Sequence, residues 1–199
     1  MTAPKPLRSD ARRNRERLLE VARIAFAAEG LGVPLDEIAR RAGVGPGTLY
    51  RHFPTKESLL QAVLQDRIQR LADDARALRE ASDPGDALLG FIDRLVAEAA
   101  PKKDLVDALA SSGAGIGARL ADTGARLRGE LGYLLARAQE CGAVRGDIGI
   151  ADLMALIAGM LFALQTRSAE LADPRRTVAV LRDGLRAAAP ASPAASRAG

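Results

Sequence analysis

The segment from Gly43 to Leu60 constrains the fold of this chain more than any other stretch. It reads Gly-Val-Gly-Pro-Gly-Thr-Leu-Tyr-Arg-His-Phe-Pro-Thr-Lys-Glu-Ser-Leu-Leu. Its glycines favour a turn, and Pro46 can begin a helix because the first helical N–H needs no partner. Pro54 breaks that helix after barely two turns. We therefore expect a very short helix from Pro46 to His52, followed by a longer one.

Two helical patterns precede this segment. Apolar residues recur at helical spacing from about Ser9 to Gly30, and a second pattern runs from Leu35 to Ala42. Three helices with a glycine turn before the third predict a helix-turn-helix. Leu49 and Phe53, four residues apart, should face inward. They would share a small core with Phe26, Ile38 and Val44.

Side chains of the short third helix suit the major groove of DNA. That groove accepts one α-helix, whose first residues reach the base edges. Gly47 lets the backbone approach closely, while Thr48 and Arg51 carry groups that can contact bases. Hydrogen bonds to phosphates set the register without reading the sequence. The residues expected to make them are Tyr50, His52 and Lys56.

Positive charge is concentrated in the same part of the chain. Residues 1–56 contain 11 Lys/Arg and 6 Asp/Glu, a net charge of +5, whereas the remainder has a net charge of −1. A solvated basic face alone would give this asymmetry. Combined with the three helices and the glycine turn, however, it predicts a domain that binds double-stranded DNA.

The remaining sequence shows further helical patterns and no convincing strand, so we expect an all-α fold of about nine helices. Thr55 and Ser58 should cap a fourth helix, and Ser82-Asp-Pro-Gly is a turn signal. Residues 111–117 look like a loop. The expected parts are a disordered tail (1–8), a helix-turn-helix domain (9–54), a linking fourth helix (55–81), a larger helical domain (82–188) and a second disordered tail (189–199). Helices of the larger domain are expected at Asp86–Ala100, Leu105–Ala110, Ile116–Cys141, Ala151–Leu171 and Pro174–Ala188.

The last two helices carry more apolar surface than one neighbour could cover. Paired with the same helices of a second subunit, they would form a four-helix bundle. Composition alone also allows an ordinary internal core. The residues assigned to this homodimer interface are Leu153, Leu156, Ile157, Met160, Leu161, Leu164, Val178, Leu181 and Leu185.

Catalytic and metal chemistry find little support in the sequence. His52 is the only histidine and Cys141 the only cysteine, so no Cys/His cluster can hold a metal. No acid, base or nucleophile constellation is visible, and we expect no enzyme activity, no cofactor and no metal. No window approaches the ~20 apolar residues of a membrane span. The first eight residues lack the apolar core of a secretory signal, so the expected location is the cytoplasm, with no membrane partner.

The segment Leu35–Leu60 resembles the DNA-binding signature of the TetR family of bacterial transcriptional regulators. The remainder, with its Asp-Pro-Gly-Asp-Ala-Leu start and Gly-Ala-Val-Arg-Gly-Asp-Ile turn, is similar to the C-terminal domain of SbtR-like members. The resemblance implies an all-α homodimer in which the larger domain binds a ligand and dimerises. The family often has a hydroxyl residue where Pro34 stands, so its phosphate contact is not expected here. Residues that match family DNA contacts are Gly47, Thr48, Tyr50, His52 and Lys56.

By the same resemblance, an apolar pocket for an unidentified small-molecule effector would lie among the helices of residues 86–171. The chain has few aromatic residues and no Trp, which favours small or aliphatic effectors. The expected function is a ligand-responsive regulator, most simply a repressor, that binds a near-palindromic operator as a dimer. The alternatives are an activator and a small-molecule-binding protein of the same fold. The expected lining residues are Phe91, Leu95, Leu109, Leu131, Tyr133, Leu135, Met154, Phe162 and Gln165.

Overall fold

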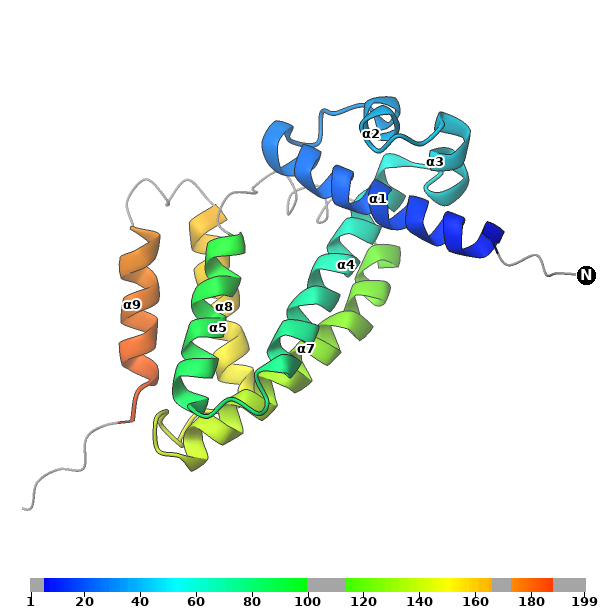
Figure 1. Cartoon of the computed structure of the whole chain (residues 1–199). Helices are drawn as coiled ribbons and strands as arrows, with labels where there is room; N and C mark the ends of the chain where they lie inside the picture. The colour runs from blue at the N-terminus through cyan, green and yellow to red at the C-terminus, as the bar shows by residue number, and fades with distance from the viewer. Residues whose placement is uncertain (1–5, 100–113, 166–172, 188–199) are drawn as a thin grey trace, which may run out of the picture. The chain divides into compact units, whose positions relative to one another are not determined.

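A computed structural model describes residues 6–99, 114–165 and 173–187, and this part of the chain is all-α (Figure 1). It contains eight helices and no strand apart from one isolated bridge, which joins Val144 and Arg186. The predicted fold class is confirmed. The helices are α1 (Pro6–Glu29), α2 (Leu35–Arg41), α3 (Pro46–His52), α4 (Lys56–Ala77), α5 (Pro84–Ala99), α7 (Ala114–Glu140), α8 (Ile150–Gln165) and α9 (Pro174–Leu185).

The described helices fall into two compact units, which comprise residues 1–74 with 101–127 and residues 75–100 with 128–199. In the first unit, one continuous core joins α1, α2, α3 and the start of α4. Each helix contributes one apolar stripe, because residues three and four apart share a helical face. The largest members of this core include Leu18, Phe26, Ile38, Leu49, Phe53 and Leu59.

Two glycines with positive φ shape the connections of the first unit. Gly30 ends α1 with φ 75°, and Gly43 lies between α2 and α3 with φ 64°. Residues with a Cβ rarely adopt this left-handed conformation, so both positions favour glycine. The Gly43 amide also donates to the Arg40 carbonyl at 3.1 Å, which closes the end of α2.

The start of α4 is capped as its sequence predicts. The Ser58 amide donates to Thr55 Oγ1 at 3.1 Å, and the Thr55 amide donates to Ser58 Oγ at 3.2 Å. This reciprocal pair satisfies two backbone donors that the first turn of a helix leaves open. At the start of α2, by contrast, Pro34 provides no side-chain cap, as expected from the missing hydroxyl.

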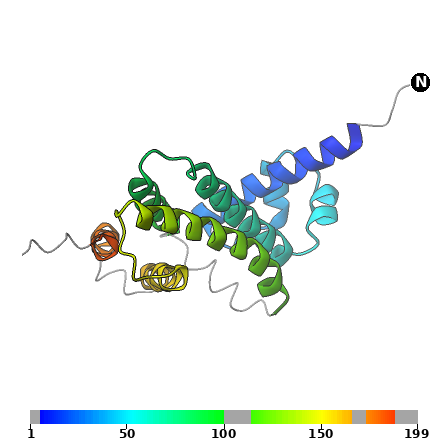
Figure 2. The same cartoon turned by 90° about the horizontal axis from the view of Figure 1, so that it is seen from below.

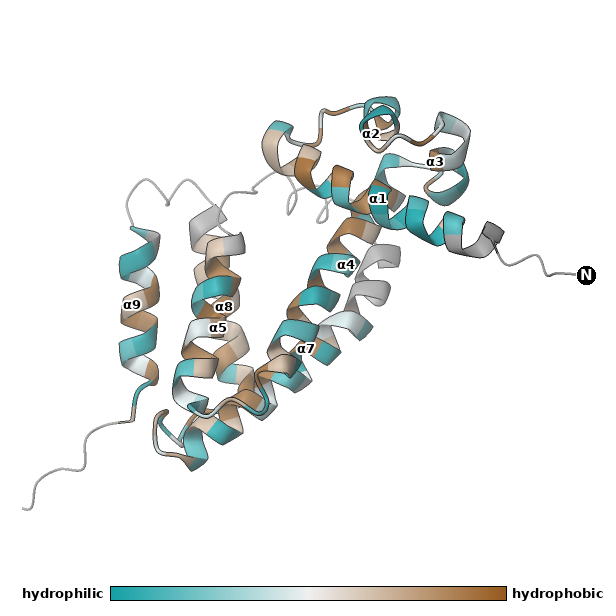
Figure 3. Cartoon of the chain, viewed as in Figure 1, coloured by the Kyte–Doolittle hydropathy of each residue, from teal (hydrophilic) through white to brown (hydrophobic). Residues whose placement is uncertain are grey.

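In the second unit, α5, α8 and α9 pack together, and Figure 2 shows α8 and α9 nearly end-on beside each other. Apolar residues dominate α8 and one side of α5 (Figure 3). The buried side chains of α5 include Leu88, Phe91 and Ile92. Those of α8 are Leu153, Ile157 and Met160, which recur at helical spacing and therefore form one stripe.

Side chains of α7 hold the chain just after α4. The Arg137 guanidinium donates to the backbone carbonyls of Arg79 and, at 3.3 Å, of Ala81. Arg79 in turn pairs with Glu130 at 2.6 Å and lies over the Tyr133 ring, 4.6 Å from its centroid. These contacts satisfy carbonyls that the end of a helix leaves without partners.

Several helix ends differ from the expected ones. The helix α1 begins at Pro6 rather than near Ser9, α4 ends at Ala77 rather than Ala81, and α7 begins at Ala114 within the expected loop. The chain leaves α9 after Leu185 because it turns to pair with the α7–α8 loop, where Arg145 N–H donates to the Leu185 carbonyl at 2.9 Å. The expected helix 105–110, residues 166–171 and both ends of the chain lie outside the described residues.

Candidate DNA-binding surface

The two faces of α3 have opposite environments. Leu49 is fully buried and Phe53, just after the helix, is also buried, which anchors the helix to the core. Tyr50 is 44% exposed, and Gly47 and Arg51 are exposed as well. This alternation follows from the helical period, because residues four apart share a face. The inward positions are therefore those that the sequence predicts.

The outward face of α3 is open at its first turn. A Cβ placed on Gly47 would meet no atom within 4 Å, so nothing in the described residues covers this backbone. Thr48 and His52 are half-buried at the edges of the face. The six residues predicted to contact DNA thus lie on or beside one surface, formed by α3 and the first residue of α4.

Tyr50 has a partner that its sequence position does not reveal. A hydrogen bond to the Asp36 carboxylate in the first turn of α2, together with slight burial, raises the pKa of the Tyr50 phenol. The phenol therefore remains a protonated donor at neutral pH. Because it has one proton, it can donate either to Asp36 or to a DNA phosphate.

Lys56 also has an internal contact. Its ammonium donates to the Leu31 carbonyl in the α1–α2 connection at 2.6 Å, and the side chain is half-buried. An ammonium has three donors, so two remain for a phosphate oxygen. The geometry gives Lys56 a role in holding the first unit together besides its predicted DNA contact.

Two arginines of α1 extend the cationic surface. The Arg15 guanidinium lies over the Phe53 ring at 5.5 Å, and Arg17 Nη2 lies 3.7 Å from the position of a Cβ on Gly43. Neither has an acidic partner among the described residues. The sequence prediction left both out of the site. Arg15 could have been found, because no acidic residue lies three or four positions from it on α1.

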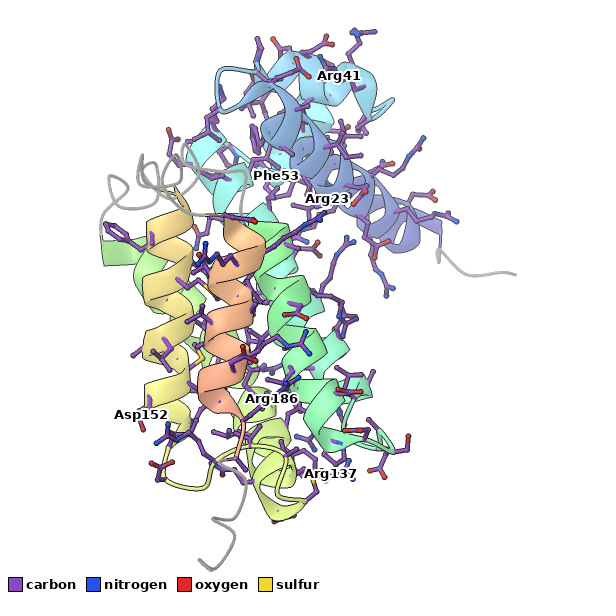
Figure 4. The ribbon with its side chains drawn as sticks, turned by 90° about the vertical axis from the view of Figure 1, so that its left-hand side faces the viewer. Arg23, Arg41, Phe53, Arg137, Asp152 and Arg186 are labelled. Atoms are coloured by element: carbon purple, nitrogen blue, oxygen red, sulfur yellow. The ribbon has the colours of Figure 1, made fainter. Side chains whose placement is uncertain are left out.

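Other cations of this unit are already paired. On α1, Arg12 pairs with Glu16 and Arg23 pairs with Glu20. On α2, Glu37 accepts hydrogen bonds from Arg40 and Arg41, each at 2.7 Å, and these bonds lower the pKa of Glu37 to about 2. Arg41 also binds Glu29 on α1. Figure 4 shows Arg41 at the outer end of this unit and Phe53 on its inner side.

Family comparisons agree with this geometry. A model of bacterial regulatory proteins of the tetR family matches residues 18–63, which contain α2, α3 and the cap of α4. A model of the C-terminal domain of SbtR-like transcriptional regulators matches residues 83–187, more than half of the chain. The chain belongs to the TetR family of bacterial transcriptional regulators. Its helix-turn-helix is therefore a DNA-binding module.

Relatives of this TetR regulator extend the similarity along the chain. The TetR transcription regulatory protein from Mycobacterium vanbaalenii is 49% identical, with 91% of this chain and 99% of that chain aligned and a TM-score of 0.73. A TetR regulator from Streptomyces coelicolor is 33% identical over 88% of this chain and 99% of that chain, with a TM-score of 0.70. An HTH-type transcriptional regulator of Staphylococcus aureus is 43% identical over 60 residues, which span 30% of this chain and only 32% of that protein.

The residues predicted to line an effector pocket occupy varied environments in this TetR regulator. Phe91, Leu95, Leu131 and Leu135 are buried and Met154 is half-buried, whereas Tyr133 and Phe162 are exposed. Two surface grooves of the second unit are lined by none of them. The structure therefore does not gather these residues around either groove, and the pocket stays a prediction. Leu109 and the side chain of Gln165 lie outside the described residues.

The residues predicted for the dimer interface separate into two sets. Leu153, Ile157, Met160 and Leu185 are already buried within one chain, so they belong to its core, and their assignment to the interface is corrected. The prediction merged two faces of α8 that the helical period keeps apart. Leu156 is 47% exposed, and Leu161, Val178 and Leu181 are half-buried. The side chain of Leu164 lies outside the described residues. Exposed apolar residues that the prediction did not include are Phe162 and Val180.

Two searches of the described residues returned nothing. None of the described helices combines the length and the apolar character that a membrane crossing needs. Within the same residues, no three His, Cys, Asp or Glu side chains gather where they could share a metal ion.

Proposed function

We propose that this TetR regulator is a ligand-responsive repressor, which binds a near-palindromic operator as a homodimer and leaves it when a small-molecule effector binds. The observation that carries the DNA-binding part is the division of α3. Buried Leu49 and Phe53 fix the helix, while Gly47, Thr48, Tyr50 and Arg51 face outward. A rigid helix with an open outer face can enter a major groove.

Dimerisation follows from the size of this surface. One helix of seven residues contacts few base pairs, so a single copy would bind weakly. Two copies related by a two-fold axis would place their recognition helices in successive major grooves, about 34–36 Å apart. The exposed apolar residues of α8 and α9 support the proposal that these helices join the subunits.

Release by an effector requires two conformations with different affinities for DNA. An effector that binds better to the conformation with misplaced heads lowers operator affinity by linkage. The α4 helix is the proposed connection, since it begins with Lys56 in the DNA-binding unit and its following residues Arg79 and Ala81 contact Arg137 of α7. A pocket among residues 86–171 remains the proposed effector site.

A mobility-shift titration with the upstream genomic DNA tests the DNA-binding part. Arg51 is exposed and has no acidic partner among the described residues, so Arg51→Ala should fold normally. It should weaken operator binding by about 1–3 kcal/mol if Arg51 contacts a base, or lower the salt slope by about one if it contacts a phosphate. Arg128→Ala, on an exposed residue of the C-terminal domain, is the matched control. Equal affinities of both variants and the wild type would refute the assigned surface.

The repressor assignment has its own test. In a reporter strain, deletion of the gene should raise transcription from the bound promoter, and a fall would identify an activator instead. A protein that binds small molecules but shows no salt-dependent DNA affinity would contradict the regulator proposal altogether.

A further inference from the structure

A groove of about 480 Å³ separates parts of α5 and α9 in the second unit. Its apolar wall comes from Val96 and Ala97 of α5 and from Val178 and Ala179 of α9. Figure 4 faces α9 and labels Arg186 at the end of this groove. None of the residues predicted for the effector pocket lines it, so it is a separate candidate site.

One wall of the groove carries an incompletely satisfied carboxylate. Asp93 Oδ2 pairs with Arg182 at 2.6 Å, which joins α5 to α9. The other oxygen, Oδ1, is buried and receives no hydrogen bond from the described residues. A buried acceptor without a donor is costly, so this position favours a ligand that carries an O–H or N–H group.

The charges around the groove leave one cation over. Arg182 is paired with Asp93, and Arg186 lies 3.7 Å from Asp183. Arg175, at the opposite end of α9, also lines the groove and has no acidic partner among the described residues. The groove therefore has a net positive charge and favours an anionic group near Arg175.

The spacing of these groups defines the ligand. Arg175 and Arg182 are seven residues apart on α9, which at about 1.5 Å per residue separates them by about 10 Å along the helix. Val178 lies between them. The geometry points to a ligand site between α5 and α9 for a medium-chain aliphatic carboxylate: its carboxylate binds Arg175, its chain lies on Val178 and Val96, and a hydroxyl donates to Asp93 Oδ1.

Three probes of equal chain length test this site by calorimetry on the full-length protein. They are ω-hydroxyoctanoate, octanoate, which lacks the hydroxyl, and octanediol, which lacks the carboxylate. Each loses one hydrogen bond to a charged group, so each should bind about tenfold more weakly than ω-hydroxyoctanoate. Equal binding of octanoate and ω-hydroxyoctanoate would show that solvent satisfies Asp93 Oδ1, and would overturn the proposal.

Variants separate this groove from any other site that takes the same probes. Arg175→Gln removes the unpaired charge, and Ala97→Phe fills the groove from an exposed position; both should weaken ω-hydroxyoctanoate binding about tenfold or more. Arg176→Gln, an exposed neighbour that does not line the groove, is the matched control. An equal loss in Arg176→Gln, unchanged binding in Arg175→Gln, or no saturable binding to the wild type would overturn the inference. Operator affinity, measured separately, does not enter this test.

Discussion

Lys56 shows how one side chain can serve both the stability and the function of this regulator. Its ammonium donates to the Leu31 carbonyl, and its position matches a family DNA contact. Lys56→Met keeps much of the apolar stem but removes every donor. It should lower the free energy of unfolding by about 1–2 kcal/mol, because a hydrogen bond from a charged group is lost. It should also weaken operator binding, as followed by fluorescence anisotropy.

The control for this prediction is Arg51→Ala, since Arg51 has no acidic partner among the described residues. That variant should lose operator affinity and keep the urea midpoint of the wild type. If Lys56→Met unfolds at the same urea concentration as the wild type, the Leu31 contact contributes nothing to stability.

A second residue-scale prediction concerns Glu37 and acid. Hydrogen bonds from Arg40 and Arg41 lower its pKa from 4.5 to about 2. The folded state therefore binds the Glu37 proton less readily than the unfolded state, so this carboxylate stabilises the fold above pH 4.5. That contribution is lost as pH falls from about 4.5 to about 2.

Glu37→Gln should accordingly be less stable than the wild type at neutral pH, and the difference should shrink across this acidic window. Urea unfolding at several pH values measures the difference directly. Because Glu37 is exposed, high salt should reduce the same difference at neutral pH. A difference that stays constant with pH would contradict the assigned ion pairs.

Single-residue roles were predictable where they depend on helical spacing and not where they depend on tertiary contacts. The inward positions of Leu49 and Phe53 followed from their separation of four residues. The partner of Lys56 is 25 residues away in the sequence, and no local pattern indicates it. The Tyr50–Asp36 hydrogen bond and the Arg15–Phe53 contact were missed for the same reason.

At the scale of elements, two glycines around α3 should respond oppositely to the same substitution. Gly43 has φ 64°, so Gly43→Ala should destabilise the fold by about 1–2 kcal/mol, the cost of a left-handed conformation with a Cβ. Gly47 lies within α3 with open space around it, so Gly47→Ala should fold at least as well as the wild type.

The readouts for these two variants are thermal unfolding and operator affinity. Gly47→Ala adds a methyl group to the surface assigned to DNA, and should weaken binding without lowering the melting temperature. A Gly43→Ala variant as stable as the wild type would mean that the turn can change its conformation.

Helix boundaries were predictable where a breaker sets them. Pro46 and Pro54 flank α3, and its range was predicted correctly. After Ala77 the sequence has no breaker before Pro84, so the end of α4 could not be located. Contacts with Arg137 on α7 hold that end instead. The two faces of α8 were confused for a related reason: the helix is apolar almost all round, and its sequence does not say which stripe faces α5.

At the scale of the whole molecule, the exposed face of α8 allows dimerisation to be separated from folding. Leu156 is 47% exposed, so Leu156→Glu should keep the helical content and produce monomers in sedimentation experiments. Operator affinity should fall with it, because one head contacts too little DNA. Leu153→Glu, in contrast, buries a charge in the core and should unfold the C-terminal domain.

The comparison of these two leucines decides which face of α8 joins the subunits. If Leu156→Glu stays dimeric at micromolar concentration, the interface lies elsewhere. If Leu153→Glu remains folded but monomeric, the original assignment of the buried stripe to the interface was right after all.

The grip of Arg137 on the carbonyls of Arg79 and Ala81 has a practical consequence for building hybrid regulators. A graft that transplants the DNA-binding head together with everything up to the Ser82 turn would carry these two carbonyls away from the effector domain that evolved to hold them. A seam placed inside α4, before Ala75, would leave Arg79, Glu130, Tyr133 and Arg137 together in one parent. Sensor and reader in this family should therefore be most exchangeable in the middle of a helix, where a protein engineer would ordinarily avoid cutting.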